Sequence, residues 1–181
     1  MSSDCRNEAA IKSFLMPKIK IIADTILQHI LEQNADVIDS IVYNKYNPKL
    51  YNRTHEFRDK AWEITEAKIQ DDTASGEFKY APWKMNYNPE FGQHGTPFHA
   101  INYWGVEGQD AREYLADIIY NGVSRGLFVG EWSNSRDAWG ELVKKIGSKR
   151  LKAWVQEGAQ EAGLDIQWHK LPRMKVSRKR K

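Results

Sequence analysis

The sequence predicts an α+β fold: a long N-terminal helix packed on a small antiparallel sheet, further helices toward the C-terminus, and a basic C-terminal tail. Three patterns carry this prediction. Apolar residues recur three or four apart over residues 11–41, they alternate over 61–87, and helical spacing returns over 110–162. With 181 residues the chain can bury a core as one domain. We therefore expect a single domain over 1–169, with an extended loop or arm at about 88–108 and a tail over 170–181.

The first helix is predicted over residues 11–41. Pro17 should kink this helix or begin its main part, because proline fits the first turn of a helix but not its interior. The helix should end before Pro48, since the residue before a proline is disfavoured in the α region. The apolar positions that define its buried face are Leu15, Ile19, Ile22, Ile26, Ile30, Val37 and Ile41.

Two strands are predicted next, over 61–70 and 76–87, joined by a turn at "DDTASG". In the second strand Phe78 and Tyr80 alternate, and then Trp83, Met85 and Tyr87 alternate in the opposite phase. The change of phase falls at Pro82, which predicts a bulge or an edge strand there. Residues 88–109 are rich in Gly and Pro and have no period, so they are expected to form the loop or arm.

Three further helices are predicted, over 110–121, 136–146 and 149–162. Ser135 and Ser148 precede the second and third and are expected to cap them. Each of the three helices is followed by a glycine, which commonly ends a helix in the left-handed conformation. These glycines are Gly122, Gly147 and Gly163. The segment "LDIQW", residues 164–168, alternates and is predicted as a last strand.

No convergent chemistry is visible in the sequence. Cys5 is the single cysteine, which excludes an internal disulfide and a metal site built on several thiolates. His94 and His99 lie five residues apart in a Gly/Pro-rich loop, a spacing that matches no strong metal-ligand motif. No nucleotide-binding loop or nucleophile elbow occurs. We therefore expect no catalytic, cofactor-binding or metal-binding residues and no enzymatic activity. A hydrolase using His94, His99 and a distant carboxylate is a weaker alternative.

The net charge of +3 conceals an asymmetry. The last twelve residues hold seven Lys and Arg and no acid, so residues 1–169 carry 20 Lys and Arg against 24 Asp and Glu, a net charge of −4. A terminal run of like charge is often an arm that binds nucleic acid or an acidic partner, and otherwise a solvated tail. The residues predicted to make such contacts are Arg173, Lys175, Arg178, Lys179, Arg180 and Lys181.

The segment "FKYAPWKMNY" places Lys79 and Lys84 among aromatic side chains, including Trp83. Surfaces that bind single-stranded nucleic acid combine these two residue types. Alternating aromatic residues in a strand, however, more often pack against a helix or at a subunit interface. We favour packing or an interface here.

A resemblance to a known family appears in "VYNKYNPKLYNRTHEF", which follows the first helix. This stretch resembles the head–tail joining, or tail-completion (neck), proteins of tailed bacteriophages, through Tyr46, Pro48, Tyr51, Arg53 and Thr54. The last predicted helix and the glycine-led segment after it, residues 163–166, are similar to the end of the same family. The "HGTPFHAINYWG" insertion and the basic tail depart from the family pattern.

The resemblance implies a non-enzymatic virion structural protein. It would be a neck, head–tail connector or tail-terminator subunit that forms a sixfold or twelvefold homo-oligomeric ring. Its partners would be neighbouring neck, portal or tail proteins and packaged DNA, in the virion and, during assembly, the host cytoplasm, with no membrane. The predicted interface residues are Tyr46, Tyr51, Arg53, Trp83 and Trp104. The alternative function is a nucleic-acid-binding accessory protein that uses the basic tail.

Overall fold

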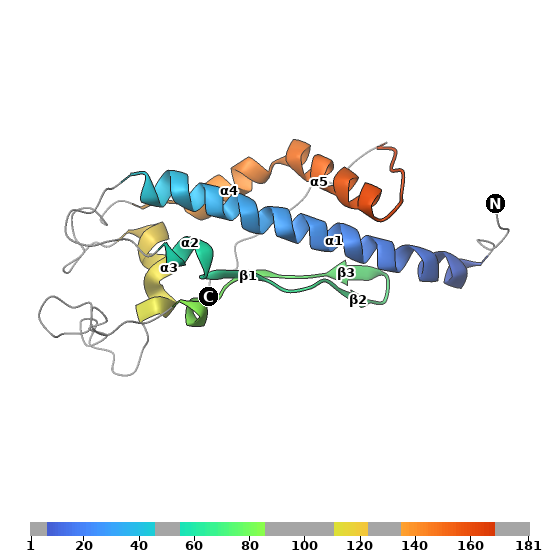
Figure 1. Cartoon of the computed structure of the whole chain (residues 1–181), viewed down its shortest axis with the longest axis horizontal. Helices are drawn as coiled ribbons and strands as arrows, with labels where there is room; N and C mark the ends of the chain where they lie inside the picture. Colours follow the sequence, from blue (N-terminus) through green and yellow to red (C-terminus); the bar gives the residue numbers. More distant parts are fainter. Residues whose placement is uncertain (1–6, 46–54, 86–110, 123–134, 169–181) are drawn as a thin grey trace, which may run out of the picture. The chain divides into compact units, whose positions relative to one another are not determined.

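The computed structural model describes residues 7–45, 55–85, 111–122 and 135–168. The chain divides into two compact units. Unit 1 comprises residues 1–33, 64–78 and 142–181, and unit 2 comprises 34–63 and 79–141. The expected fold class is confirmed: a long N-terminal helix, short antiparallel strands and later helices (Figure 1). The single domain over 1–169 stays a prediction, and the arm at 88–108 and the tail over 170–181 lie outside the described residues.

The first helix, α1, extends over Glu8–Ile38 and continues as a π-helix over Asp39–Tyr43. Its end before Pro48 agrees with the sequence. The prediction that Pro17 begins its main part is wrong, because the helix starts at Glu8 and runs through the proline. Proline removes one hydrogen bond of the helix, but packing holds the turns around it in place: Met16, beside it, is buried.

The predicted strand pair forms, but in shorter pieces. The strands are β1 (Trp62–Ile64), β2 (Lys68–Gln70), β3 (Thr73–Ser75) and β4 (Phe78–Tyr80). Strand β2 pairs antiparallel with β3, and β1 pairs with β4. The turn is only Asp71–Asp72, so β3 occupies residues expected in the turn. Asp71 has φ 53°, the left-handed conformation that a two-residue hairpin turn requires.

Each predicted strand is interrupted at a residue that contacts α1: Ala67 between β1 and β2, and Gly76 between β3 and β4. The backbone N–H of Ala67 donates to the Asp24 carboxylate of α1 at 2.6 Å, instead of to the opposite strand. On the facing side, Gly76 lies so close to Leu27 of α1 that a Cβ at this position would collide with it. The hairpin therefore packs against α1 at Ala67 and Gly76, and the N–H of Ala67 does not take part in the strand ladder.

The second predicted strand also ends early. Ala81 donates its N–H to the carbonyl of Ala61, and the chain then turns into the 3₁₀-helix η2, Pro82–Lys84. Because Pro82 has no N–H to donate, the ladder stops at this residue. The prediction that the strand continues after Pro82 is therefore wrong as far as residue 85, where the described segment ends. Trp83 lies on the 3₁₀-helix η2 instead of on a sheet.

The later helices are α2 (Glu56–Asp59), α3 (Ala111–Asn121), α4 (Ala138–Ile146) and α5 (Ser148–Glu161). The three predicted helix-ending glycines, Gly122, Gly147 and Gly163, all have positive φ. Gly147, however, has ψ 162°, outside the left-handed helical region, and it is also the N-cap residue of α5.

The predicted serine caps are wrong. Asp137 caps α4 by accepting a hydrogen bond from the N–H of Gly140 at 2.9 Å, while the Ser135 hydroxyl donates to the carbonyl of Tyr120. Ser148 is itself the first residue of α5, and no side chain caps that helix. Ser135, three residues before α4 begins, instead binds a neighbouring element, α3.

The predicted last strand, residues 164–168, is also wrong. This segment has no regular structure and runs back along α5. Leu164 donates its N–H to the carbonyl of Ala159, and the Trp168 indole N–H donates to Gln156 at 3.1 Å. The alternating apolar residues therefore pack against one helix instead of pairing with a strand.

In unit 1, α5 packs closely on α1 (Figure 1). A Cβ on Gly158 would lie only 2.9 Å from the Cα of Ile22, so the glycine permits this close approach. Side chains then bridge the two helices. Thr25 donates to Glu161 at 2.7 Å, and His29 contacts Glu157 at 2.8 Å and stacks on Trp154 with ring centroids 5.2 Å apart.

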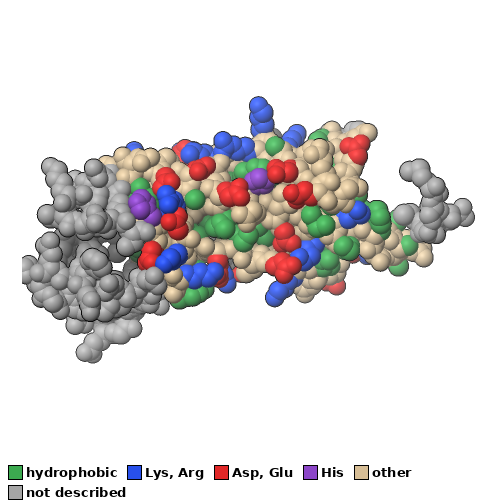
Figure 2. All heavy atoms as spheres, in the orientation of Figure 1, with side chains coloured by type: hydrophobic (Ala, Val, Ile, Leu, Met, Phe, Trp, Pro, Cys, Tyr) green, Lys and Arg blue, Asp and Glu red, His purple; other side chains and the backbone are tan. Residues whose placement is uncertain are grey.

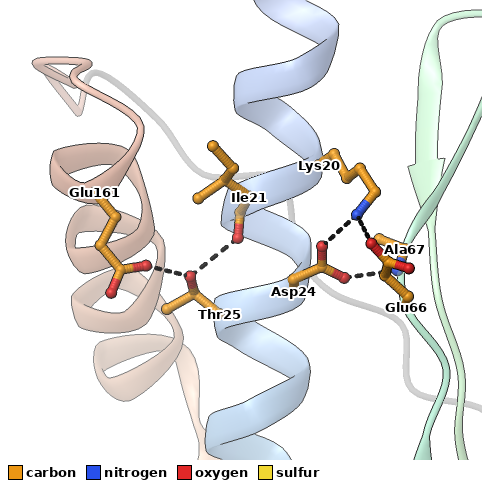
Figure 3. A network of polar contacts seen from close by, with 7 residues as sticks. All are labelled: Lys20, Ile21, Asp24, Thr25, Glu66, Ala67 and Glu161. Atoms are coloured by element: carbon orange, nitrogen blue, oxygen red, sulfur yellow. Dashed lines mark hydrogen bonds and ion pairs between the residues drawn. The ribbon is translucent and has the colours of Figure 1, made fainter.

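The opposite side of α1 binds the hairpin through polar contacts, shown in Figure 3. Asp24 accepts hydrogen bonds from Lys20, at 2.8 Å, and from the N–H of Ala67. Lys20 also pairs with Glu66. Polar contacts on both sides of α1 thus set the positions of α5 and of the hairpin in unit 1.

The core of unit 2 is aromatic. The Trp62 ring contacts those of Phe57, Tyr80 and Tyr120, at centroid distances of 5.8, 5.3 and 6.2 Å. Trp62, Phe57 and Tyr120 are buried. Strands β1 and β4, the short helix α2 and helix α3 each contribute at least one of these rings, so the cluster joins all four elements.

Candidate interfaces

Trp83 is the one predicted interface residue that the structure describes. Tyr46, Tyr51, Arg53 and Trp104 lie outside the described residues, as do Cys5, His94 and His99. The predicted tail contacts lie outside them too; these are Arg173, Lys175, Arg178, Lys179, Arg180 and Lys181.

Trp83 lies on η2 with its side chain largely exposed. Its exposed fraction is 60%, the highest among the large apolar side chains that the structure describes as exposed. The Nζ atom of Lys79 lies 5.8 Å from the centroid of the Trp83 ring, within range of a cation–π contact. The indole is therefore available to an external partner, and the ammonium group of Lys79 lies over its ring.

A single carboxylate holds two lysines beside this indole. Glu63 accepts from Lys79 through Oε1 at 3.0 Å and from Lys84 through Oε2. The two ammonium groups, that of Lys84 first, hold the pKa of Glu63 below its ordinary value of 4.5. The Glu63 side chain is 16% exposed and the lysine side chains are 41% and 46% exposed, so the positive groups lie outward and the set has a net charge of +1.

A second exposed surface lies on the N-terminal half of α1. At 3.6 residues per turn, Ile11, Phe14 and Ile21 fall within about 80° of one another around the helix. All three are exposed, Phe14 most of all at 54%. Ile19 and, in β2, Ile69 are exposed as well. We call Ile11, Phe14 and Ile21 the α1 stripe. Large apolar side chains that gather in one area of a surface commonly mark a binding site.

The cations around the α1 stripe are engaged within the chain. Lys12 pairs with Glu8 and Asp72, each at 2.9 Å, and these contacts raise its pKa above 10.5. Lys18 donates to the carbonyl of Ala162 and lies 5.0 Å from the centroid of the Phe14 ring. Lys20 is bound by Asp24 and Glu66 (Figure 3). The lysines nearest the stripe thus have anionic or carbonyl partners, which favours an apolar partner over an anionic one.

The α1 stripe was not identified as a site from the sequence. Ile19 was placed on the buried face of the helix, and it is exposed. A signal was nevertheless present: Phe14 and Ile21 are large apolar residues outside the predicted buried face. Where a helix of this length carries apolar residues on two faces, the second face needs a partner of its own.

An arginine that the sequence patterns do not single out, Arg58, pairs with two carboxylates. Arg58, at the end of α2, donates through one terminal nitrogen to both oxygens of Asp39 at 3.0 Å, and through Nε to Asp59 at 2.6 Å. The Asp59 and Asp39 carboxylates raise the pKa of Arg58, and Arg58 lowers that of Asp59. Arg58 therefore links α2 to the π-helix. Arg53, one of the predicted interface residues, lies five residues earlier and outside the described residues.

The charged side chains on the face drawn in Figure 2 are mixed in sign, with acidic and basic groups side by side and apolar groups between them. Within the described residues, no three His, Cys, Asp or Glu side chains come together in a way that could hold a metal ion. None of the helices in the described part of the chain is long and apolar enough to cross a membrane.

Comparison with known proteins finds no matching protein family, curated protein or solved structure.

Proposed function

We propose that the chain is a non-enzymatic structural subunit that assembles with copies of itself into a ring, in the neck, head–tail connector or tail terminator of a tailed-phage virion. The resemblance of residues 43–57 to the head–tail joining proteins supports the family. The observation that carries the self-assembly is the α1 stripe, Ile11, Phe14 and Ile21, which is exposed in the single chain.

The chemistry of the stripe favours a protein partner. Covering exposed apolar side chains removes them from water and stabilises the complex by roughly 25 cal/mol per Å² of apolar area. Phe14 offers a large ring with few rotatable bonds, a type of residue enriched at interface cores. Because Lys12 and Lys20 are already paired within the chain, a neighbour does not have to neutralise them. A second copy that buries this stripe would therefore gain apolar contact at a small electrostatic cost.

A ring makes a further demand on the surface. Closed rings use two different patches on each subunit, one on each side of the contact. The stripe supplies one patch, and the predicted interface residues Tyr46, Tyr51, Arg53 and Trp104 remain candidates for the other. The sixfold or twelvefold symmetry that the resemblance implies depends on the angle between the two patches.

The test compares Phe14→Glu and Ile21→Glu with Ala9→Glu. All three place a carboxylate on an exposed position of the same helix, but Ala9 lies about 120° or more around the helix from each stripe residue. By light scattering, the wild type and Ala9→Glu should form the same oligomer, while the two stripe variants should lose it. Circular dichroism should show equal helix content in all four proteins. A wild-type chain that stays monomeric, or stripe variants with wild-type mass, would disprove the proposal.

A further inference from the structure

We propose that Trp83, Lys79 and Lys84 form a binding site for single-stranded nucleic acid, in which an unpaired base stacks on the Trp83 indole and the lysines contact its phosphates. We call these three residues the Trp83 patch. The site shares no residue with the basic tail or with the α1 stripe, and it would give the subunit a nucleic-acid contact of its own.

The first step of the argument is the exposed ring. At 60% exposure the indole leaves an apolar aromatic surface in water, next to β4 but outside the aromatic core that buries Trp62. Aromatic side chains of proteins that bind single strands provide stacking surfaces of this kind. A base has a flat π face that can cover an indole, and any of the four bases can do so.

The second step is the arrangement of charge. Glu63 uses one carboxylate oxygen for each lysine, so both ammonium groups are anchored beside the same group. An ammonium has three N–H donors, and the contact with Glu63 takes one of them from each lysine. The remaining donors belong to side chains that are more than 40% exposed. With two cations and one largely covered anion, the patch keeps a net charge of +1 and can accept a phosphate.

The third step separates the nucleic acid from other anionic partners. An acidic peptide could satisfy the lysines, but its carboxylates would leave the indole uncovered. Duplex DNA could also contact the lysines, but its bases are already stacked on one another and cannot cover the ring. A single strand supplies both a phosphate and a free base, so it is the partner that uses all three side chains.

The α1 stripe serves as an internal contrast. Phe14 is also an exposed aromatic residue with a lysine over its ring, Lys18 at 5.0 Å. That lysine is bound to the carbonyl of Ala162, and the nearby Lys12 pairs with two carboxylates. In the Trp83 patch the ratio is reversed, with two lysines to one carboxylate. The excess of cations is what distinguishes the nucleic-acid site from the apolar one.

The experiment measures binding of the full chain to fluorescein-labelled oligothymidylate by anisotropy, at several salt concentrations. Trp83→Ala should weaken binding by roughly 5- to 150-fold, the range that one stacked base accounts for. Trp83→Phe should retain part of the affinity. Lys79→Gln with Lys84→Gln should lower the slope of log affinity against log salt by about 1.4, which corresponds to two phosphate contacts on a single strand.

Two further variants make the test specific. Lys149→Gln with Lys152→Gln removes two charges from α5 and should leave the affinity unchanged. Glu63→Gln removes the one acid of the set and raises its net charge from +1 to +2, so it should bind more tightly than the wild type. A merely structural role for Glu63 would instead make this variant weaker or unchanged.

Three results would overturn the proposal. They are a wild type that does not bind oligothymidylate, a Trp83→Ala variant with wild-type affinity, and a loss in the α5 variant equal to that in the Lys79 and Lys84 variant. If polyglutamate binds the patch while oligothymidylate does not, the partner is an acidic protein and the assignment to nucleic acid is wrong.

Discussion

The two units are stabilised by different kinds of contact. Unit 2 has a cluster of four aromatic side chains, Trp62 and the three rings that contact it, and three of the four are buried. Unit 1 has a glycine that lets α5 approach α1, and polar side chains that link α1 to its neighbours on both sides (Figure 3). The stability of unit 2 thus depends on the packing of its aromatic rings, and that of unit 1 on the close approach of the α1 and α5 backbones.

The same difference extends to the exposed surfaces. In unit 1 the lysines near the α1 stripe bind carboxylates or a carbonyl within the chain, so the stripe offers an external partner mainly apolar contact. In unit 2 the lysines beside Trp83 outnumber the acid that holds them. Exposure of an aromatic ring alone therefore does not determine its partner, and the charges around the ring must be counted as well.

The largest expected effect is on the aromatic core of unit 2. Trp62→Ala should lower the free energy of unfolding by about 3–5 kcal/mol, because it removes a buried ring that three others contact. Trp83→Ala is the matched control, since it removes the same ring from an exposed site and should cost less than about 0.5 kcal/mol. Chemical denaturation followed by circular dichroism measures both. Similar losses for the two variants would show that the ring cluster is not the core.

The next effect tests the close approach in unit 1. Gly158→Ala should destabilise the protein by about 1–3 kcal/mol, because the new Cβ would lie 2.9 Å from the Cα of Ile22. The intrinsic preference for helix acts in the opposite direction, since alanine is better than glycine in a helix by up to about 1 kcal/mol. The sign of the change thus separates the two effects. A Gly158→Ala variant more stable than the wild type would contradict the packing described here.

A smaller effect is expected at Arg58, which links α2 to the π-helix in unit 2. Arg58→Ala should cost about 1 kcal/mol, because its ion pairs are partly exposed to solvent. Arg58→Lys should recover little of this, since an ammonium cannot reproduce the fork that reaches Asp39 and Asp59 together. Thermal unfolding of the three proteins at one salt concentration decides the point. A lysine variant as stable as the wild type would mean that charge alone suffices.

The smallest effect is the pH dependence that Glu63 adds. Its pKa in the folded chain lies below the ordinary 4.5, so its pairing with Lys84 and Lys79 stabilises the fold fully above about pH 4.5. This contribution is lost as the pH falls through the lowered pKa. The wild type should therefore be more stable than Glu63→Gln at neutral pH, and the difference should shrink below pH 4.5. A stability difference that is constant from pH 7 to pH 3 would contradict the pairing.

The elements of the fold were largely predictable because their signals are local. The spacing of apolar residues located α1, and the helix-ending glycines located the ends of the C-terminal helices. The errors arose where another helix took contacts that the strand pattern assigns to a sheet. Asp24, 43 residues away in the sequence, takes the N–H of Ala67 from the strand ladder. Residues 164–168 instead fold back on α5, the helix directly before them, and an alternating pattern does not distinguish that packing from a strand.

The candidate sites were less predictable than the fold. Trp83 was proposed as an interface residue from its aromatic neighbours, and the structure describes it as exposed on η2. Glu63 can anchor both Lys79 and Lys84 because β1 lies beside β4. The sequence predicts that these two strands pair, but it does not give the register of the pairing. Arg58 was missed because the resemblance pointed to Arg53.

The most direct test of the proposed assembly is the native mass of the wild-type chain, measured by mass photometry over a range of concentrations. A closed ring predicts one discrete species at six or twelve times the 21.0 kDa mass of the monomer, unchanged over the range. A monomer at every concentration, or a broad series of masses that grows with concentration, would contradict the account.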